Sequence, residues 1–84
     1  MLKSEVYKFH YTRRQGRQLT YDVTINVVQW ESGVFAYESW VHQAGQFKGN
    51  GLVFPLSSKT PTDAASEART RVESNIEELA GVTE

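Results

Sequence analysis

Two histidines are the side chains of this 84-residue sequence best suited to bind a transition metal. If they lie on strands, His10 and His42 fall on one face of a sheet, where Asp22 or Glu38 could complete a minimal ligand set. The histidines do not form an H-x-x-x-H or H-E-x-x-H arrangement, and there is no cysteine to supply thiolates. We therefore expect surface histidines, no bound metal and no cofactor.

Residues with catalytic potential form no recognisable pattern. The sequence has no G-x-S-x-G elbow, no P-loop and no dinucleotide-binding fingerprint. The glycines at 45, 49 and 51 do not have the spacing of a phosphate cradle, and the adjacent Glu77 and Glu78 diverge on a helix. We therefore do not expect an enzyme. A small enzymatic or ligand-binding domain, with a pocket between sheet and helix, is the last of three hypotheses.

Four basic residues gather near one predicted hairpin: Lys8, Arg13, Arg14 and Arg17. Guanidinium groups recognise phosphate well, so a nucleic-acid-binding module is the second hypothesis. The net charge is only −1, however. Residues 1–59 carry seven Lys/Arg and four Asp/Glu, which gives +3, and residues 60–84 carry two and six, which gives −4. We favour a solvated loop, and we do not expect nucleic acid to be the main partner.

The two tryptophans suggest a protein-binding surface. Trp30 and Trp40 fall on or near the sheet face opposite the predicted helix, together with Val28 and Val34. Exposed aromatic side chains commonly anchor protein partners. A chain of this length also builds only a small core, which favours association. The first hypothesis is therefore a non-catalytic interaction module that binds a protein partner or itself, as a homodimer.

These residues are positioned by elements with two different periods. Before about residue 57, apolar residues alternate with polar ones as in strands; after residue 60 they recur as in a helix. We predict an α+β fold in a single domain over residues 1–84: an antiparallel meander of three or four strands with one C-terminal helix packed across one face. The predicted strands cover about 5–13, 19–30, 34–42 and 46–54, and the helix about 61–80.

Local signals refine the strands. The clearest alternation runs from Leu19 to Val27, and its slip at Val27 and Val28 predicts a bulge or the end of the strand. Gly49, Asn50 and Gly51 are expected to interrupt and weaken the fourth strand, and Pro55 cannot donate to a ladder, so this strand is expected at a sheet edge. The predicted sheet core consists of Tyr7, Phe9, Leu19, Tyr21, Val23, Ile25, Phe35, Tyr37 and Val41.

The helix has clear signals at its start. Thr60 is suited to the N-cap and Pro61 to the first helical position. The predicted apolar stripe facing the sheet is Ala65, Ala68, Val72, Ile76 and Leu79.

Two segments carry a family resemblance. The G-x-F-A-Y segment at 33–37 is followed by T-P-T-D-A-A-S-E-A at 60–68, which leads into the helix. This combination resembles the N-terminal domain of HicB-like antitoxins, a sheet-then-helix unit, over residues 33–79. The family's L-P-G-C stretch is absent, so we transfer no functional residues. The resemblance implies a protein-binding, dimeric role.

Targeting signals give the expected location. The first residues, MLKSEVYKFHYTRR, have no apolar region typical of a signal peptide, and the longest apolar runs are too short to span a bilayer. We expect a cytoplasmic protein without a membrane partner.

Overall fold

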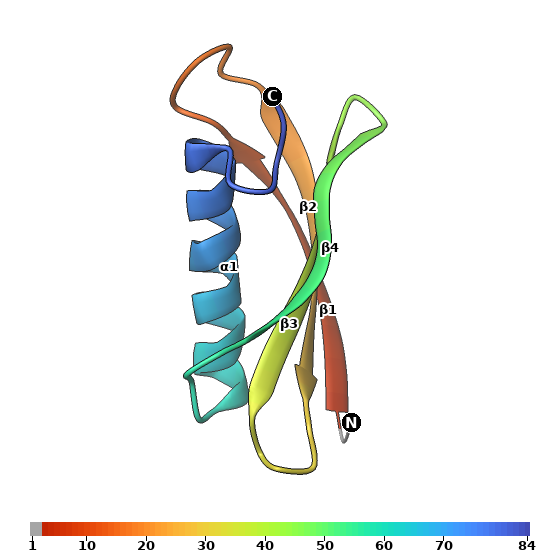
Figure 1. Ribbon diagram of the computed structural model, residues 1–84, viewed down its shortest axis with the longest axis vertical. Coiled ribbons are helices and arrows are strands. Elements are labelled where there is room, and N and C mark those ends of the chain that lie inside the picture. The colour runs from red at the N-terminus through yellow and green to blue at the C-terminus, as the bar shows by residue number, and fades with distance from the viewer. Residues whose placement is uncertain (1–2) are drawn as a thin grey trace.

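The computed structural model describes residues 3–84 and contains, within them, one antiparallel sheet and one helix (Figure 1). The strands follow one another across the sheet in chain order, and the helix comes last. Their bounds are β1 Lys3–Thr12, β2 Thr20–Gln29, β3 Phe35–Gln43, β4 Gln46–Pro55 and α1 Pro61–Glu78. This arrangement confirms the predicted α+β fold, and each bound lies within two residues of its expected position.

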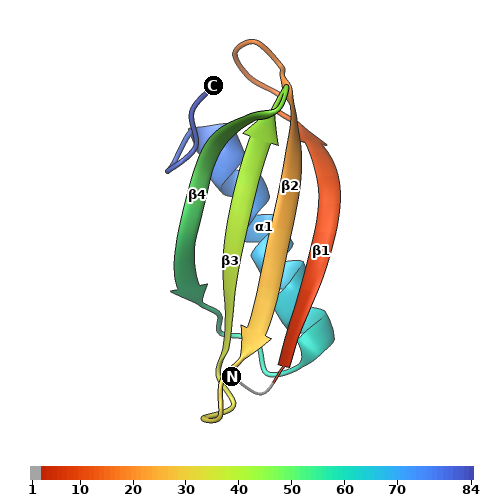
Figure 2. The same ribbon diagram turned by 90° about the vertical axis from the view of Figure 1, so that its right-hand side faces the viewer.

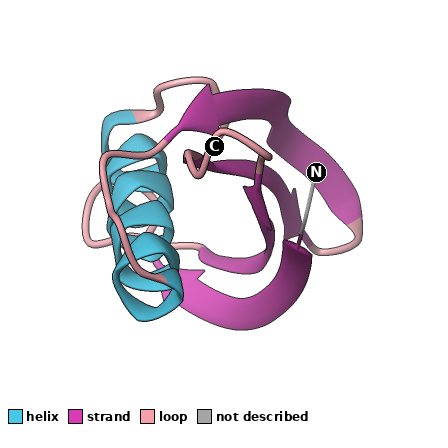
Figure 3. Ribbon diagram, turned by 90° about the horizontal axis from the view of Figure 1, so that it is seen from below, coloured by secondary structure: helices cyan, strands magenta, loops and turns pink. Residues whose placement is uncertain are grey.

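The helix covers one face of the sheet. In Figure 2, α1 crosses behind the strands, where it packs on β2 and β3. Viewed along the strands, the sheet curls strongly, and its concave side faces α1 (Figure 3). The right-handed twist of long strands favours such curling. We refer below to the concave face, which α1 covers, and the convex face, which it does not.

The core lies on the concave face. It contains alternate side chains of the two central strands, namely Tyr21, Val23, Ile25, Val27, Phe35, Tyr37 and Val41. The buried residues of α1 are spaced four apart: Ala64, Ala68, Val72 and Ile76. A row with this spacing runs obliquely along a helix, so it can follow a curled sheet. Leu56, before α1, and Val82, after it, are buried in the same cluster.

The core differs from the prediction at its borders. Ala64, not Ala65, is the first buried residue of α1, and Leu79 adopts the left-handed conformation at the C-cap and is 38% exposed. Tyr7 is exposed and Phe9 is only partly buried. Both lie on the edge strand β1, whereas α1 packs on the central strands.

Of the two irregularities expected from the sequence, the bulge in β2 is wrong and the interruption of β4 at residues 49–51 coincides with a register shift. β2 keeps its register through Val27 and Val28 to its end, and Val28 is buried on the convex face. The register instead shifts between β3 and β4, around Trp40 and Val41, opposite the glycine-rich segment 49–51. β4 lies at the sheet edge, as predicted.

Candidate functional site

The convex face carries all four residues predicted for protein interaction. Val28 pairs with Ala36 across β2 and β3. The backbone N–H of Trp30 donates to the Val34 carbonyl at 3.0 Å, which extends this hairpin by one pair. Trp30 and Val34 are 40% and 39% exposed. Trp40 lies further along β3 and is half-buried. The structure thus brings Trp30, Val34 and Val28 together, with Trp40 at a distance along the same face.

Two edge-strand valines widen this surface. We define the apolar band as Val6, Val28, Trp30, Val34, Ala36 and Val53. Val6 and Val53 lie at the two ends of one row of the sheet, with Asn26 and Glu38 between them, and both valines are exposed. Val28 and Ala36 are buried although they face away from α1, so side chains of their own face must cover them. Sequence analysis did not single out Val6 or Val53, although Val6 alternates with the residues predicted to face the core.

Polar side chains also lie on the convex face. His10 lies 3.0 Å from the carboxylate of Asp22, and the ring of His42 packs edge-on against Phe47 at 5.5 Å. Within residues 3–84, no three side chains of His, Cys, Asp or Glu lie close enough together to hold a metal ion. Polar and apolar side chains are therefore mixed along the convex face: Glu38 lies in the row of Val6 and Val53, and Phe47, beside His42, is 54% exposed.

Arg13 is the predicted nucleic-acid-binding residue whose position differs most from the expectation. It points inward and is 8% exposed. Its Nε donates to the carbonyl oxygen of Ile76 at 3.0 Å and its Nη2 to that of Glu77 at 2.8 Å. Its Nη1 pairs with the Glu84 carboxylate at 3.0 Å. The last carbonyls of a helix lack intrahelical partners and carry partial negative charge, so Arg13 caps the end of α1.

The remaining basic residues, Lys8, Arg14 and Arg17, are exposed, but they share their region with carboxylates. Glu77 accepts hydrogen bonds from the Tyr11 hydroxyl and from the Arg14 backbone N–H at 2.9 Å. These bonds, the Tyr11 bond above all, lower the pKa of Glu77 to about 2, so this carboxylate stays ionised near neutral pH. The hairpin therefore presents both signs of charge.

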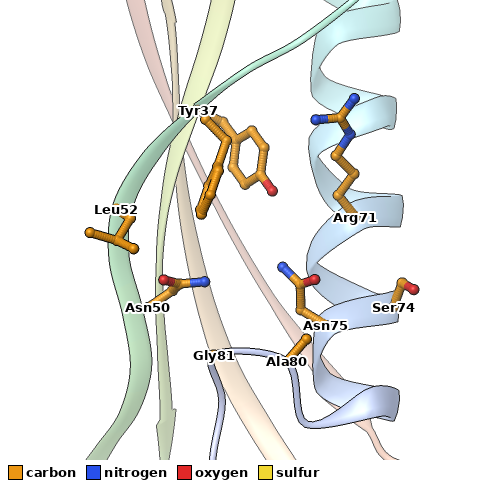
Figure 4. A pocket seen from close by; sticks show the side chains of 9 residues that line it. Tyr37, Asn50, Leu52, Arg71, Ser74, Asn75, Ala80 and Gly81 are labelled. Carbon is orange, nitrogen blue, oxygen red and sulfur yellow. The ribbon is translucent and has the colours of Figure 1, made fainter.

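A cleft of about 450 Å³ lies between β4 and the C-terminal half of α1. Figure 4 shows the side chains of Tyr37, Asn50 and Asn75 directed into it from three different elements. The side chains of Leu52 and Ser74 border the cleft and point away from its centre. A pocket between sheet and helix was only the last of the three hypotheses, because the glycines at 49 and 51 predicted an interruption of β4 but not its position relative to α1.

No protein-family model, curated protein or solved structure matches this chain. The likeness to HicB-like antitoxins therefore stays a resemblance of short motifs. Among residues 3–84, no helix is long and apolar enough to cross a membrane.

Proposed function

We propose that this chain is a non-catalytic, cytoplasmic interaction module that binds protein through the convex face of its sheet, and that the partner is a second copy of itself. The observation that carries the proposal is the apolar band. Exposed apolar side chains gathered on one face are typical of interaction sites, and tryptophan is among the residues that contribute most to binding. The band combines an exposed tryptophan with exposed valines from β1 and β4 and from the β2–β3 turn.

The dimensions of the convex face suit a protein partner. The molecule extends 41 Å along its longest axis and 18 to 20 Å across. A stable interface buries about 800 Å² on each partner, which is close to the area that one face of such a sheet offers. Burial of apolar surface contributes about 25 cal/mol per Å², so the band could supply a substantial part of the association free energy.

The charges of the convex face favour a second copy. Lys8 lies on β1 and Glu38 on the central strand β3, whereas His10 and Asp22 already contact each other at 3.0 Å. In a two-fold dimer each contact occurs twice, so a positive edge can meet the partner's negative centre in two equivalent places.

Nucleic-acid binding is less well supported. Arg13 is occupied at the end of α1, and the Glu84 carboxylate accepts a hydrogen bond from the Arg17 backbone N–H at 2.8 Å. Phosphate would have to approach this carboxylate as well as the exposed arginines.

The proposal is tested by the oligomeric state. Sedimentation equilibrium of the unmodified chain should show a dimer, and Trp30→Glu, which places a charge in the apolar band, should show a monomer with an unchanged far-UV circular dichroism spectrum. Thr62→Glu is the matched control, because it adds the same charge on the first turn of α1, on the opposite side of the sheet. It should remain dimeric.

Two outcomes would reject self-association through this face. In the first, the unmodified chain remains monomeric at the highest concentration it tolerates. In the second, a dimer forms but neither Trp30→Glu nor Val34→Glu weakens it, which would place the interface on another surface.

A further inference from the structure

The cleft between β4 and α1 is built by two close approaches of the backbone. The register of β4 against β3 shifts beside Gly49, and a Cβ added at Gly49 would overlap the carbonyl oxygen of Gly81. The backbone N–H of Thr83 donates to the Lys48 carbonyl at 2.9 Å, so the segment after α1 is fixed against β4. This segment closes one end of the cleft, while the other end stays open.

Two aromatic rings form the apolar wall of the cleft. The centroids of Tyr37 and Phe54 lie 5.8 Å apart, with the ring planes tilted by 36°. Both residues line the cleft. Tyr37 is only 2% exposed and Phe54 is partly buried, so a flat ligand ring would pack mainly on Phe54, with the offset or tilted geometry that aromatic groups prefer.

Two carboxamides face each other across the cleft. The Asn75 side chain projects from α1 and the Asn50 side chain from β4, and Figure 4 shows both directed into the space between them. The backbone of Asn75 is fixed, because its carbonyl accepts the Ala80 N–H at 2.9 Å in the helix cap. A Cβ added at Gly81 would lie 3.0 Å from the Asn50 amide nitrogen, so the side chain of Asn50 passes close to Gly81. Each carboxamide offers both a donor and an acceptor.

The cleft carries little free charge. Arg71 lines it, but its Nη2 pairs with Glu67 at 2.8 Å and its Nη1 donates to the Pro55 carbonyl at 3.0 Å. The Tyr37 hydroxyl, which points into the cleft in Figure 4, has a pKa raised by burial and partly lowered again by Arg71 and Asn75. It is therefore a neutral donor at physiological pH. An anionic ligand would find no uncompensated cation among these groups.

We infer that this cleft binds a small neutral planar compound: an aromatic or heteroaromatic ring that carries a carboxamide or lactam group. The ring packs mainly on Phe54, and the amide edge of the ligand exchanges hydrogen bonds with Asn50 and Asn75. The cleft volume falls within the range of about 300–1,000 Å³ that is usual for small-molecule sites. The site lies on the concave side of the sheet and so goes beyond the interaction proposed for the convex face.

Nuclear magnetic resonance titration of the ¹⁵N-labelled chain tests the inference with nicotinamide as the probe. We expect saturable shifts of the side-chain amides of Asn50 and Asn75 and of the Gly81 N–H, with a millimolar dissociation constant typical of so small a ligand. Benzoate, which keeps the ring but replaces the amide with a charge, and cyclohexanecarboxamide, which keeps the amide but lacks the flat ring, should both bind more weakly.

Single substitutions show whether nicotinamide binds in the cleft or elsewhere on the chain. Asn75→Leu should weaken nicotinamide binding about tenfold, the effect of losing one or two hydrogen bonds. Asn50→Ala serves as the second variant if Asn75→Leu disturbs the helix end. Gln46→Leu is the matched control, because it removes an exposed amide at the start of the same strand. It should leave the affinity unchanged.

Three results would overturn the inference: no saturable shifts, shifts that map away from the cleft, or benzoate binding more tightly than nicotinamide. The sheet-face variant Trp30→Glu should bind nicotinamide as the unmodified chain does. Loss of self-association and loss of ligand binding are therefore distinguishable.

Discussion

The guanidinium group of Arg13 lies 3.0 Å from the carboxylate of Glu84, although the two residues are 71 positions apart in the chain. The same carboxylate oxygen accepts the backbone N–H of Arg17. Arg13 also donates to the last carbonyls of α1. The pair therefore joins the β1–β2 hairpin, the end of the helix and the segment that follows it.

Removing this group should destabilise the fold. Arg13→Ala removes the guanidinium bonds to the carbonyls of Ile76 and Glu77 and to the Glu84 carboxylate, although the Leu79 N–H and the Gln15 amide still donate to those two carbonyls. We expect the free energy of unfolding to fall by about 2 kcal/mol. Urea denaturation followed by circular dichroism measures the loss. Arg17→Ala is the matched control from the same hairpin: its side chain is exposed and its backbone N–H survives the substitution. It should cost less than about 0.5 kcal/mol, and equal losses in the two variants would contradict the capping role of Arg13.

Glu67 should make stability depend on pH. Its carboxylate accepts hydrogen bonds from the hydroxyls and backbone N–H groups of Ser57 and Ser58. These bonds, the Ser58 hydroxyl foremost, lower its pKa from 4.5 to about 2. A carboxyl group whose pKa is lower in the folded state stabilises the fold above the unfolded pKa, and the stabilisation disappears as the pH falls through the folded value.

The difference in urea midpoint between Glu67→Gln and the unmodified chain, measured as a function of pH, isolates the contribution of the Glu67 carboxylate. The variant should have the lower urea midpoint at pH 7, and the difference should shrink between about pH 5 and pH 2. Glu31→Gln, an exposed change in the β2–β3 turn, should leave the midpoint unchanged across the series. A difference between Glu67→Gln and the unmodified chain that does not vary with pH would show that the carboxylate's charge is not responsible.

The parts of the fold that sequence could predict depend on local signals. Alternation placed Val23 and Ile25 on the core face, where both are buried. The helix start is local as well, and the hydroxyl of Thr60 accepts the Asp63 N–H at 3.2 Å as an N-cap should. Trp30 and Val34 were placed on the convex face because they continue the alternation of their strands. Such features need only the neighbouring residues in the chain.

The parts that sequence missed depend on contacts between distant segments. Arg13 is a charged residue next to a loop, so its sequence context predicts exposure. It is buried only because the C-terminal end of α1 packs against it. Val53 joins the apolar band only through the register of β4 against β3. The helical stripe was ambiguous because neighbouring alanines, Ala64 and Ala65, fit the period about equally well.

Ile76 and Leu79 test the corrected stripe, since sequence analysis placed both residues against the sheet. Ile76 is fully buried, whereas Leu79 lies beyond the last turn and is 38% exposed. Ile76→Ala should lower the free energy of unfolding by about 2–5 kcal/mol, because it removes buried methyl groups and leaves a cavity. Leu79→Ala should cost less than about 1 kcal/mol. If urea denaturation showed similar losses of unfolding free energy for the two variants, Leu79 would face the sheet as the sequence predicted.

Gly49 should tolerate a side chain less well than its positive φ alone would predict. Its φ of 141° and that of Gly45, 79°, both lie where side chains are disfavoured. A Cβ at Gly45 would meet nothing within 4 Å, whereas one at Gly49 would overlap the Gly81 carbonyl. Gly45→Ala therefore reports the conformational cost, about 1–2 kcal/mol. Gly49→Ala should cost about 2 kcal/mol more, because β4 and the segment after α1 must separate. In the folded variant, hydrogen exchange of the Thr83 N–H, which bonds to Lys48, should accelerate. If the two alanine variants lose equal stability and Thr83 stays protected, the packing of this segment against β4 is looser than the structure shows.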